Sequence, residues 1–263
     1  MSAQTPETPL TGGNVNAAVT RIGDTVRRAP ARNADTVHRF LQHLEAQGFA
    51  ASPRFLGTDA DGREMLSLLP GSSDMPETLW TEDRPLIAAA AMLRRFHAVS
   101  ARYRPSPEDD WAYAWPDRQG HELICHNDFA PYNMLFENGL PTGIVDFDLV
   151  GPAPRHRDLA YLAYWLVPLS FTDGDLAEHT QRQGEAGFPR LRLICESYGT
   201  ADRRSLLDMV ANVLGHMGSE TACTAMIGPE AAARLREGGH FDHWKREAAA
   251  YEAHLPELIE ALS

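Results

Sequence analysis

The sequence predicts an α+β fold of two lobes, a small antiparallel β-sheet lobe with one helix followed by a larger, mainly helical lobe. Two observations support this prediction. As far as residue 71, short apolar segments alternate with turn residues such as Gly, Asn and Asp, and one segment has helical spacing. Beyond residue 82, apolar residues recur mainly at helical spacing. We expect residues 1–71 to form the first lobe and residues 72–263 the second.

The first lobe begins with residues 1–9, whose polar, Pro- and Thr-rich composition predicts a flexible tail. A turn over residues 11–16 should join a short strand at Leu10 to a second strand over Ala17–Ile22. Paired glycines and asparagines let backbone N–H groups point at phosphates, although the same residues also form ordinary hairpin turns. The candidates for phosphate binding in this turn are Gly12, Gly13 and Asn14.

The rest of the first lobe should contain a strand over Asp24–Arg28, a helix over about Asp35–Gln47, and strands over Pro53–Gly57 and Glu64–Leu69. Residues 66–71 would connect the lobes, where backbone groups can hydrogen-bond a purine base. An edge strand that ends in a Pro-Gly turn explains the same segment. The candidates for base recognition here are Leu66 and Leu68.

The second lobe should begin with a long helix over about Glu82–Tyr103, in which we expect His97 to be a packed histidine rather than a catalyst. The following loop holds Trp111 and Trp115, and core packing and a lid over a pocket explain these tryptophans equally well. Five more helices are predicted near the C-terminus, over about Asp175–Gly187, Arg190–Tyr198, Ala201–Met217, Pro229–Gly238 and Phe241–Leu262.

The most informative stretch is HNDFAPYN at 126–133, followed by IVDFD at 144–148. It places Asp128 five residues before Asn133, and Asp146 at the end of an apolar run. A strand from Asn133, a turn at Asn138-Gly139 and a strand returning to Asp146 would form a hairpin. This hairpin would bring the Asn133 and Asp146 oxygen atoms to one edge, where they suit magnesium ions.

These motifs resemble those of the aminoglycoside phosphotransferase and choline kinase-like family of small-molecule kinases, a branch of the protein kinase-like fold. HNDFAPYN, IVDFD and DLAYLAYW at 158–165 carry the resemblance, and weaker matches are GGNVN at 12–16, GREMLSLLPG at 62–71 and LRRFH at 93–97. The resemblance implies an enzyme that moves the γ-phosphoryl group of ATP or GTP to a hydroxyl of a small molecule, such as an aminoglycoside, another amino alcohol or a sugar.

The resemblance also implies roles for individual residues. Asp128 would orient and deprotonate the acceptor hydroxyl, while Asn133 and Asp146 would hold Mg²⁺. His126 would fix the catalytic loop by hydrogen bonding to backbone. Asp158 would cap its helix or brace the catalytic loop from below.

The segment after IVDFD bears on the acceptor. Asp158 lies only 12 positions after Asp146, which leaves no room for the platform on which protein kinases bind peptides. We therefore expect a small-molecule acceptor and no protein substrate. Asp148, at a position where protein kinases have glycine, would contact the metal directly or through a neighbouring group.

The lysine that kinases place on the third strand is missing, because the only lysine in the chain is Lys245. Strand alternation points one of Arg27 and Arg28 into the cleft. Family relatives often end this strand with Arg-x-Pro, which Arg28-Ala29-Pro30 matches, so Arg28 is the candidate for gripping phosphate oxygens. Solvated strand-edge charges are the alternative interpretation of both arginines.

The glutamate that normally pairs with this lysine is also missing from the expected helix. Val37 stands at its position, and Glu45, at the far end of the helix, is expected to be solvated. The sequence therefore predicts that the ion pair is absent and that Arg28 is oriented by other means.

Composition restricts the other possibilities. The net charge of −12 argues against a nucleic-acid partner, and no apolar run is long enough to cross a membrane. Three widely spaced cysteines indicate reduced thiols, and the N-terminus lacks a secretory signal, so we expect a cytoplasmic protein.

Two other functions stay open. A pseudokinase-like module that binds a ligand without turnover is favoured by the missing lysine and glutamate, and the intact aspartates oppose it. A metal-dependent hydrolase is disfavoured because the histidines follow no metal-binding pattern. A few acidic residues of the C-terminal helices could recognise amines of an acceptor, although a solvated surface explains most of them: Glu178, Glu185, Glu196, Asp208 and Glu220.

Overall fold

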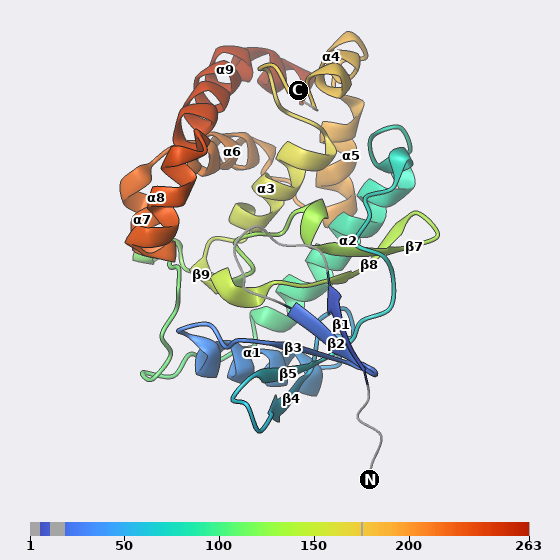
Figure 1. Ribbon diagram of the computed structural model, residues 1–263. Coiled ribbons are helices and arrows are strands. Elements are labelled where there is room, and N and C mark those ends of the chain that lie inside the picture. Colours follow the sequence, from blue (N-terminus) through green and yellow to red (C-terminus); the bar gives the residue numbers. More distant parts are fainter. Residues whose placement is uncertain (1–5, 11–18, 175, 263) are drawn as a thin grey trace.

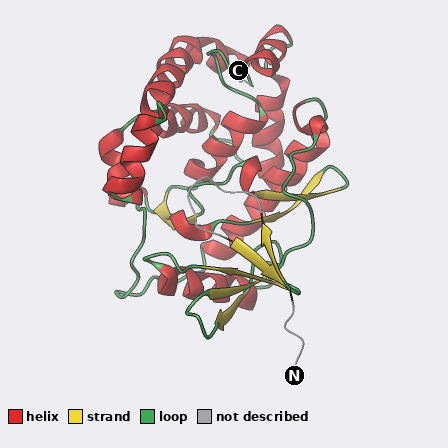
Figure 2. Cartoon of the chain, viewed as in Figure 1, coloured by secondary structure: helices red, strands yellow, loops and turns green. Residues whose placement is uncertain are grey.

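The small lobe is built on one antiparallel sheet with the strand order β1-β2-β3-β5-β4 (Figures 1 and 2). The computed structural model describes residues 6–10, 19–174 and 176–262. Within them the α+β, two-lobed architecture is confirmed. The strands of this sheet are β1 (Glu7–Leu10), β2 (Val19–Ile22), β3 (Thr25–Arg28), β4 (Phe55–Thr58) and β5 (Glu64–Ser67).

The N-terminal segment is not wholly a tail, because Glu7–Leu10 pairs with β2 from Glu7↔Ile22 to Leu10↔Val19. The expectation of a flexible tail over residues 1–9 is therefore wrong for residues 7–9. The strand is fully exposed, so it has no apolar alternation that a sequence pattern could reveal. Backbone pairing holds it at the edge of the sheet, together with an ion pair between Glu7 and Arg63 at 3.2 Å.

One helix, α1 (Ala34–Ala46), packs beside this sheet. Its buried face repeats at helical spacing, with Val37, Phe40, Leu41 and Leu44 at most 2% exposed. These residues belong to the same hydrophobic cluster as the core of the large lobe. The apolar stripe thus fixes α1 between the sheet and the body of the molecule.

The large lobe is mainly helical, and α2 packs against α5 while α6 packs against both α3 and α9. Every large-lobe helix that was predicted is present, with boundaries within three residues of the expected ones. The helices are α2 (Asp83–Ser100), α3 (His156–Leu166), α4 (Ala177–Glu185), α5 (Pro189–Tyr198), α6 (Arg203–Met217), α7 (Glu220–Ile227), α8 (Pro229–Glu237) and α9 (His240–Ala261).

Two small ribbons lie between the sheet and the helices. The predicted hairpin is formed by β7 (Met134–Glu137) and β8 (Leu140–Ile144). The second ribbon consists of β6 (Leu123–Cys125) and β9 (Gly151–Ala153). It was not predicted, because each strand has only three residues and β9 has the sequence Gly-Pro-Ala, which is not typical of a strand. Helix α7 was missed as well, since only Cys223 of its eight residues is buried.

The connection between the lobes is pinned to the hairpin. Ser72 exchanges backbone hydrogen bonds of 3.0 and 2.8 Å with Phe136 of β7. Gly71 has φ +109°, and a Cβ there would come within 3.0 Å of the Phe136 carbonyl oxygen. We propose Gly71 as the boundary between the lobes. Of the helices in the described residues, none has the length and apolar character that a membrane span requires.

Candidate active site

The loop between β6 and β7 carries Asp128. Its preceding residue, Asn127, has φ +65°, a left-handed conformation that asparagine tolerates better than most residues. The Asn127 side-chain N–H group donates to the Leu149 carbonyl at 2.9 Å. The turn ends in the short 3-10 helix η3 (Pro131–Asn133). The loop is therefore held in one conformation on both sides of Asp128.

The Asp128 carboxylate receives hydrogen bonds from two residues of its own loop. Asn133 donates its side-chain N–H to Oδ2 at 2.8 Å and to the Asp128 carbonyl at 3.0 Å. The Tyr132 hydroxyl donates to Oδ1 and contacts the Tyr161 hydroxyl at 2.9 Å. Because the Asn133 amide nitrogen faces Asp128, its oxygen faces the other way.

Asp158, at the start of α3, lies directly beneath this loop. Its two carboxylate oxygens accept the backbone N–H groups of His126 at 2.8 Å and Asn127 at 2.7 Å. His126 in turn donates through Nε2 to the Val145 carbonyl at 3.0 Å. Burial lowers the pKa of His126, so the ring is neutral at pH 7. The loop is thus tied to α3 on one side and to the end of the hairpin on the other.

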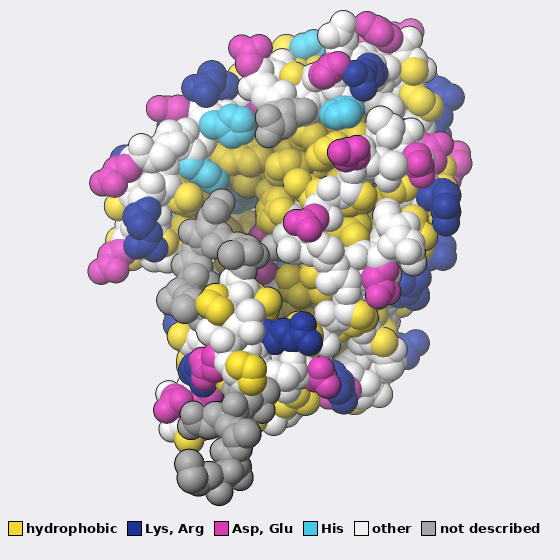
Figure 3. Space-filling model, turned by 45° about the vertical axis from the view of Figure 1, so that its right-hand side comes forward, with side chains coloured by type: hydrophobic (Ala, Val, Ile, Leu, Met, Phe, Trp, Pro, Cys, Tyr) yellow, Lys and Arg dark blue, Asp and Glu magenta, His cyan; other side chains and the backbone are white. Residues whose placement is uncertain are grey.

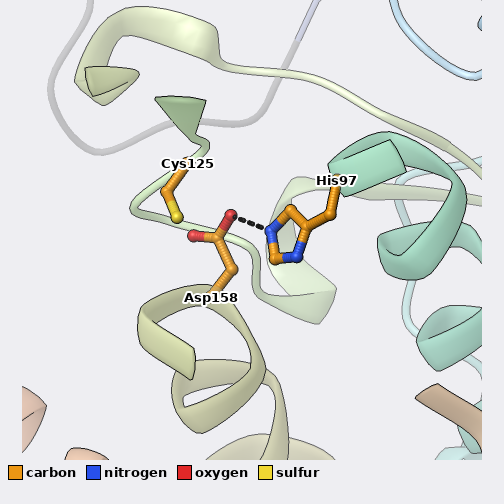
Figure 4. Close-up of side chains that lie close together, drawn as sticks. All are labelled: His97, Cys125 and Asp158. Atoms are coloured by element: carbon orange, nitrogen blue, oxygen red, sulfur yellow. Dashed lines mark hydrogen bonds and ion pairs between the residues drawn. The ribbon is translucent and has the colours of Figure 1, made fainter. Parts of the chain in front are cut away.

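Figure 4 shows a buried group formed by His97, Cys125 and Asp158 that has the residue types of a metal site. Its ligand atoms are already engaged. His97 binds Asp158 through Nε2 at 3.0 Å and the Tyr198 hydroxyl through Nδ1 at 2.8 Å. Burial raises the pKa of the Cys125 thiol well above its ordinary value, which disfavours the thiolate that metals require. The group therefore braces the loop and does not have the properties of a metal centre.

Asp158→Asn should lower the free energy of unfolding by about 2–4 kcal/mol, because its amide nitrogen would face buried N–H donors. Burial alone would raise the pKa of Asp158, but bonds from His97 and the His126 backbone outweigh it and lower that pKa. The stabilisation is therefore present at neutral pH and is lost as the pH falls below the ordinary aspartate range. Urea unfolding at pH 7 measures the change. Asp202→Asn, at the exposed cap of α6, is the control, and an equal midpoint shift in both variants would contradict the brace.

Asp146 follows β8 in a left-handed conformation with φ +65°. Burial and the neighbouring Asp148 charge raise the pKa of its carboxyl group to about 6, against the opposing effect of Arg28. A non-glycine residue held in this conformation beside like charges is typical of functional sites. A cation bound here would relieve the repulsion between these carboxylates.

Arg28, at the end of β3, reaches across to this group. Its terminal nitrogens bind both oxygens of Asp148 at 2.5 and 3.1 Å, and Nη1 lies 3.8 Å from Asp146. Burial would lower the pKa of Arg28, but the charges of Asp148 and Glu64 outweigh it and raise that pKa. The guanidinium group therefore stays charged in a half-buried position between the lobes.

The prediction that no glutamate of α1 pairs with Arg28, and that another group orients it, is confirmed in the described residues. Glu64 stands directly opposite Arg28 in the β3–β5 register, is 2% exposed, and accepts from the Arg28 Nε atom. His38 of α1 contacts the other Glu64 oxygen at 2.6 Å. The carboxylate comes from the neighbouring strand instead of the helix, so a search restricted to the helix misses it. Glu45 pairs with Arg54 at 3.6 Å on the surface.

The oxygen atoms around this point fit Mg²⁺, which prefers carboxylate and amide oxygens. The Asn133 side-chain oxygen and the carboxylates of Asp146 and Asp148 supply such a set. A hydrogen bond of 2.9 Å from the Val145 N–H to the Asn133 carbonyl holds the two ends of the hairpin together. These residue types are suited to a metal that neutralises the neighbouring charges of Asp146 and Asp148.

Five other residues were predicted to bind the nucleotide. Gly12, Gly13 and Asn14 lie outside the described residues. Leu66 is buried in β5, where it pairs with Val26. The Leu68 N–H donates to the Asp24 carbonyl at 3.0 Å, so this donor is already engaged within the sheet.

The two tryptophans of the loop before β6 pack onto the core. Trp111 contacts the rings of Phe40 and Tyr103, and Trp115 packs against the β6–β9 ribbon. Core packing is therefore the correct interpretation of this pair.

Comparison with known proteins identifies the family. The model of the phosphotransferase enzyme family matches residues 106–194, which include the Asp128 loop and the β7–β8 hairpin. Over its whole length the chain is similar to the trifolitoxin immunity protein of Rhizobium leguminosarum bv. trifolii, with 32% identity over 96% of this chain and 97% of that protein. The chain belongs to the phosphotransferase enzyme family.

Other relatives of this phosphotransferase agree with the assignment. The aminoglycoside 3'-phosphotransferase of Streptomyces fradiae is 30% identical over 54% of this chain and 59% of that enzyme. In fold, the chain is similar to the gentamicin complex of APH(2")-IIa, with a TM-score of 0.58, 12% identity, and coverage of 93% of this chain and 91% of that one. ADP-bound APH(2'')-Ib has a TM-score of 0.56, again at 12% identity, and covers 98% of this chain and 94% of that one.

Proposed function

We propose that this phosphotransferase moves the γ-phosphoryl group of ATP or GTP to a hydroxyl group of a small molecule, with Mg²⁺ as cofactor. The observation that carries the proposal is one arrangement of side chains. Asp128 is held by Asn133 in the same loop, while Asp146 and Asp148 lie beside Arg28 at the end of the adjoining hairpin. Phosphoryl transfer requires a base, oxygen ligands for a metal and a cation for the phosphates.

In this mechanism Asp128 accepts the proton of the acceptor hydroxyl as the oxygen attacks the γ-phosphorus. The hydrogen bonds from Tyr132 and Asn133 fix the direction of its carboxylate oxygens. Asp158 and His126 keep the backbone of the loop in place. Their contribution is positional, because neither side chain contacts a reacting atom.

Asn133, Asp146 and Asp148 would hold the metal, which when bound neutralises charge on the phosphate oxygens. Arg28 would bind these oxygens through the same two nitrogens that contact Asp148. Nucleotide binding would thus exchange the Arg28–Asp148 contact for a contact between Arg28 and phosphate. Glu64 holds the Nε side of Arg28 and leaves the terminal nitrogens for the ligand.

The relative that is similar over the whole length is an immunity protein, which favours a protective role. We propose that the acceptor is a toxic or antibiotic compound that phosphorylation inactivates. Such a reaction belongs in the cytoplasm, where nucleoside triphosphates are available. It needs neither nucleic acid nor a protein substrate.

The test is a transfer assay with ATP or GTP, Mg²⁺ and a panel of hydroxylated compounds, in which mass spectrometry detects an added phosphoryl group. A phosphorylated product formed only with Mg²⁺ supports the proposal. Saturable nucleotide binding with no product from any compound would favour the alternative, a ligand-binding module without turnover. The Arg28–Asp148 contact is the observation that keeps this alternative open.

Glu64→Gln should raise the KM for nucleotide about tenfold and leave the KM for the acceptor unchanged, because it weakens the charged bond that orients Arg28. Steady-state kinetics with each substrate varied in turn measures both constants. Glu45→Gln removes a glutamate that pairs only on the surface and serves as the control. Equal nucleotide KM values in the two variants would exclude the positioning role of Glu64.

A further inference from the structure

An aromatic wall adjoins the Asp128 carboxylate. Tyr132 contacts Asp128 through its hydroxyl, is 41% exposed, and packs edge-to-face on Trp165 with 5.5 Å between ring centroids. Tyr164 continues the wall from Trp165 to Trp244, with centroid distances of 5.6 and 5.5 Å. Tyr132 and the partly exposed Trp165 form the surface of this group, and Tyr161, Tyr164 and Trp244 are buried behind them; we call the five residues the aromatic wall.

The wall is firmly built. The Trp80 indole N–H donates to the Trp165 carbonyl at 2.9 Å, and the Tyr132 and Tyr161 hydroxyls are 2.9 Å apart. Figure 3 shows a hollow between the small lobe and the C-terminal helices whose surface is mainly apolar, with few acidic side chains. An acceptor that brings a hydroxyl to Asp128 therefore meets aromatic carbon next to the reacting atom.

The acidic residues that could recognise an amine-rich acceptor are engaged elsewhere. Glu178, Glu196, Asp208 and Glu220 each form an ion pair with an arginine, and Glu185 accepts from Gln181 at 3.0 Å. These contacts lie on exposed helix surfaces.

Besides Asp128, Glu247 is a carboxylate that contacts the wall, and it is also engaged. Glu247 is 1% exposed and accepts hydrogen bonds from Tyr164 at 3.1 Å, Ser170 at 3.0 Å and Thr172. These three hydroxyl groups surround it beneath the surface. An ammonium group taken out of water needs a carboxylate or several acceptors, and this carboxylate is not exposed to supply one.

We propose that the acceptor is a hydroxylated compound with a flat aromatic face, which stacks on Trp165 and Tyr132 and presents its hydroxyl to Asp128. This inference rests on the proposed phosphotransferase function and specifies its substrate class. Stacking selects a flat ring through contact area, while the Asp128 contact selects the hydroxyl. A polyamine needs exposed carboxylates, but of the two carboxylates that contact the wall, Asp128 binds the hydroxyl and Glu247 is buried.

The test compares three probes in the full-length protein with Mg²⁺ and nucleotide: chloramphenicol as an aromatic alcohol, kanamycin as a polyamine, and choline as a quaternary amine. Chloramphenicol should quench tryptophan fluorescence saturably and accelerate release of ADP or GDP. Trp165→Leu should raise the half-saturating concentration of chloramphenicol about tenfold. Trp165→Phe keeps a ring, so its half-saturating concentration should stay within about threefold of the wild-type value. Trp111→Phe, in the core, controls for the loss of one fluorophore.

Two outcomes would overturn the inference. One is saturable binding or turnover of kanamycin or choline in place of chloramphenicol. The other is the absence of both saturable binding and turnover with chloramphenicol, or a chloramphenicol response in Trp165→Leu equal to that of the wild type. A magnesium-dependent thermal shift with nucleotide, measured on the same samples, separates these outcomes from failure of the proposed function, because nucleotide binding does not use the aromatic wall.

Discussion

Asp128→Asn should lower kcat by about 10²–10⁴-fold and leave nucleotide binding intact, because it removes the base and keeps the shape of the side chain. The asparagine oxygen can still accept one of the two hydrogen bonds that Tyr132 and Asn133 give to the carboxylate, and the exposed Tyr132 hydroxyl can turn to accept from the amide nitrogen. It cannot take the proton of the acceptor hydroxyl at neutral pH. Transfer rates at saturating nucleotide and acceptor measure the loss.

The same preparation should show the nucleotide-induced rise in melting temperature of the wild type, which separates lost chemistry from lost folding. Asp117→Asn is the matched control, since Asp117 lies at an exposed turn and its side chain accepts the Gln119 N–H. A transfer rate for Asp128→Asn equal to that of the control would refute the assignment of the base.

Asp146→Asn should abolish the magnesium-dependent stabilisation by nucleotide. A ligand at 100 times its Kd stabilises the native state by about 2.7 kcal/mol, which corresponds to roughly 5–10 °C in a chain of this size. The substitution removes the carboxylate charge from the metal set and leaves Arg28 with Asp148 as its partner. Thermal unfolding with ATP and with GTP, each with and without Mg²⁺, measures the effect and selects the donor.

Removing the metal with EDTA should have the same effect on the wild type as the substitution has with the metal present. The control is again Asp117→Asn, which should keep the full shift. A shift of undiminished size in Asp146→Asn would place the metal on other residues.

Much of the fold could be predicted because its signals are local. The apolar stripe of α1 and the helical spacing of α2 place these helices within a few residues of their observed limits. The hairpin of β7 and β8 follows from Asn138-Gly139, two residues that readily adopt positive φ. By contrast, β1, β6, β9 and α7 have no such pattern, because pairing with distant segments or a single buried residue holds them in place.

The same division applies to the site. Asp128, Asn133 and Asp146 could be found because their spacing along one short stretch of chain is itself the signal. Glu64 could not, since it lies 36 positions from Arg28 and the two meet only through the β3–β5 register. The aromatic wall was missed for a similar reason. Its tyrosines and tryptophans come from η3, α3 and α9. From sequence alone, a tryptophan in a helix is predicted to be an ordinary core residue.

The sequence by itself determined the two-lobed fold, the family and the motif of the Asp128 loop, because local spacing encodes helices, turns and motif positions. The tertiary structure alone decided which carboxylate orients Arg28, what braces the Asp128 loop, and which aromatic side chains lie beside Asp128. These relations join segments far apart in the chain. They depend on strand register and helix packing, which buried apolar surface sets for the molecule as a whole.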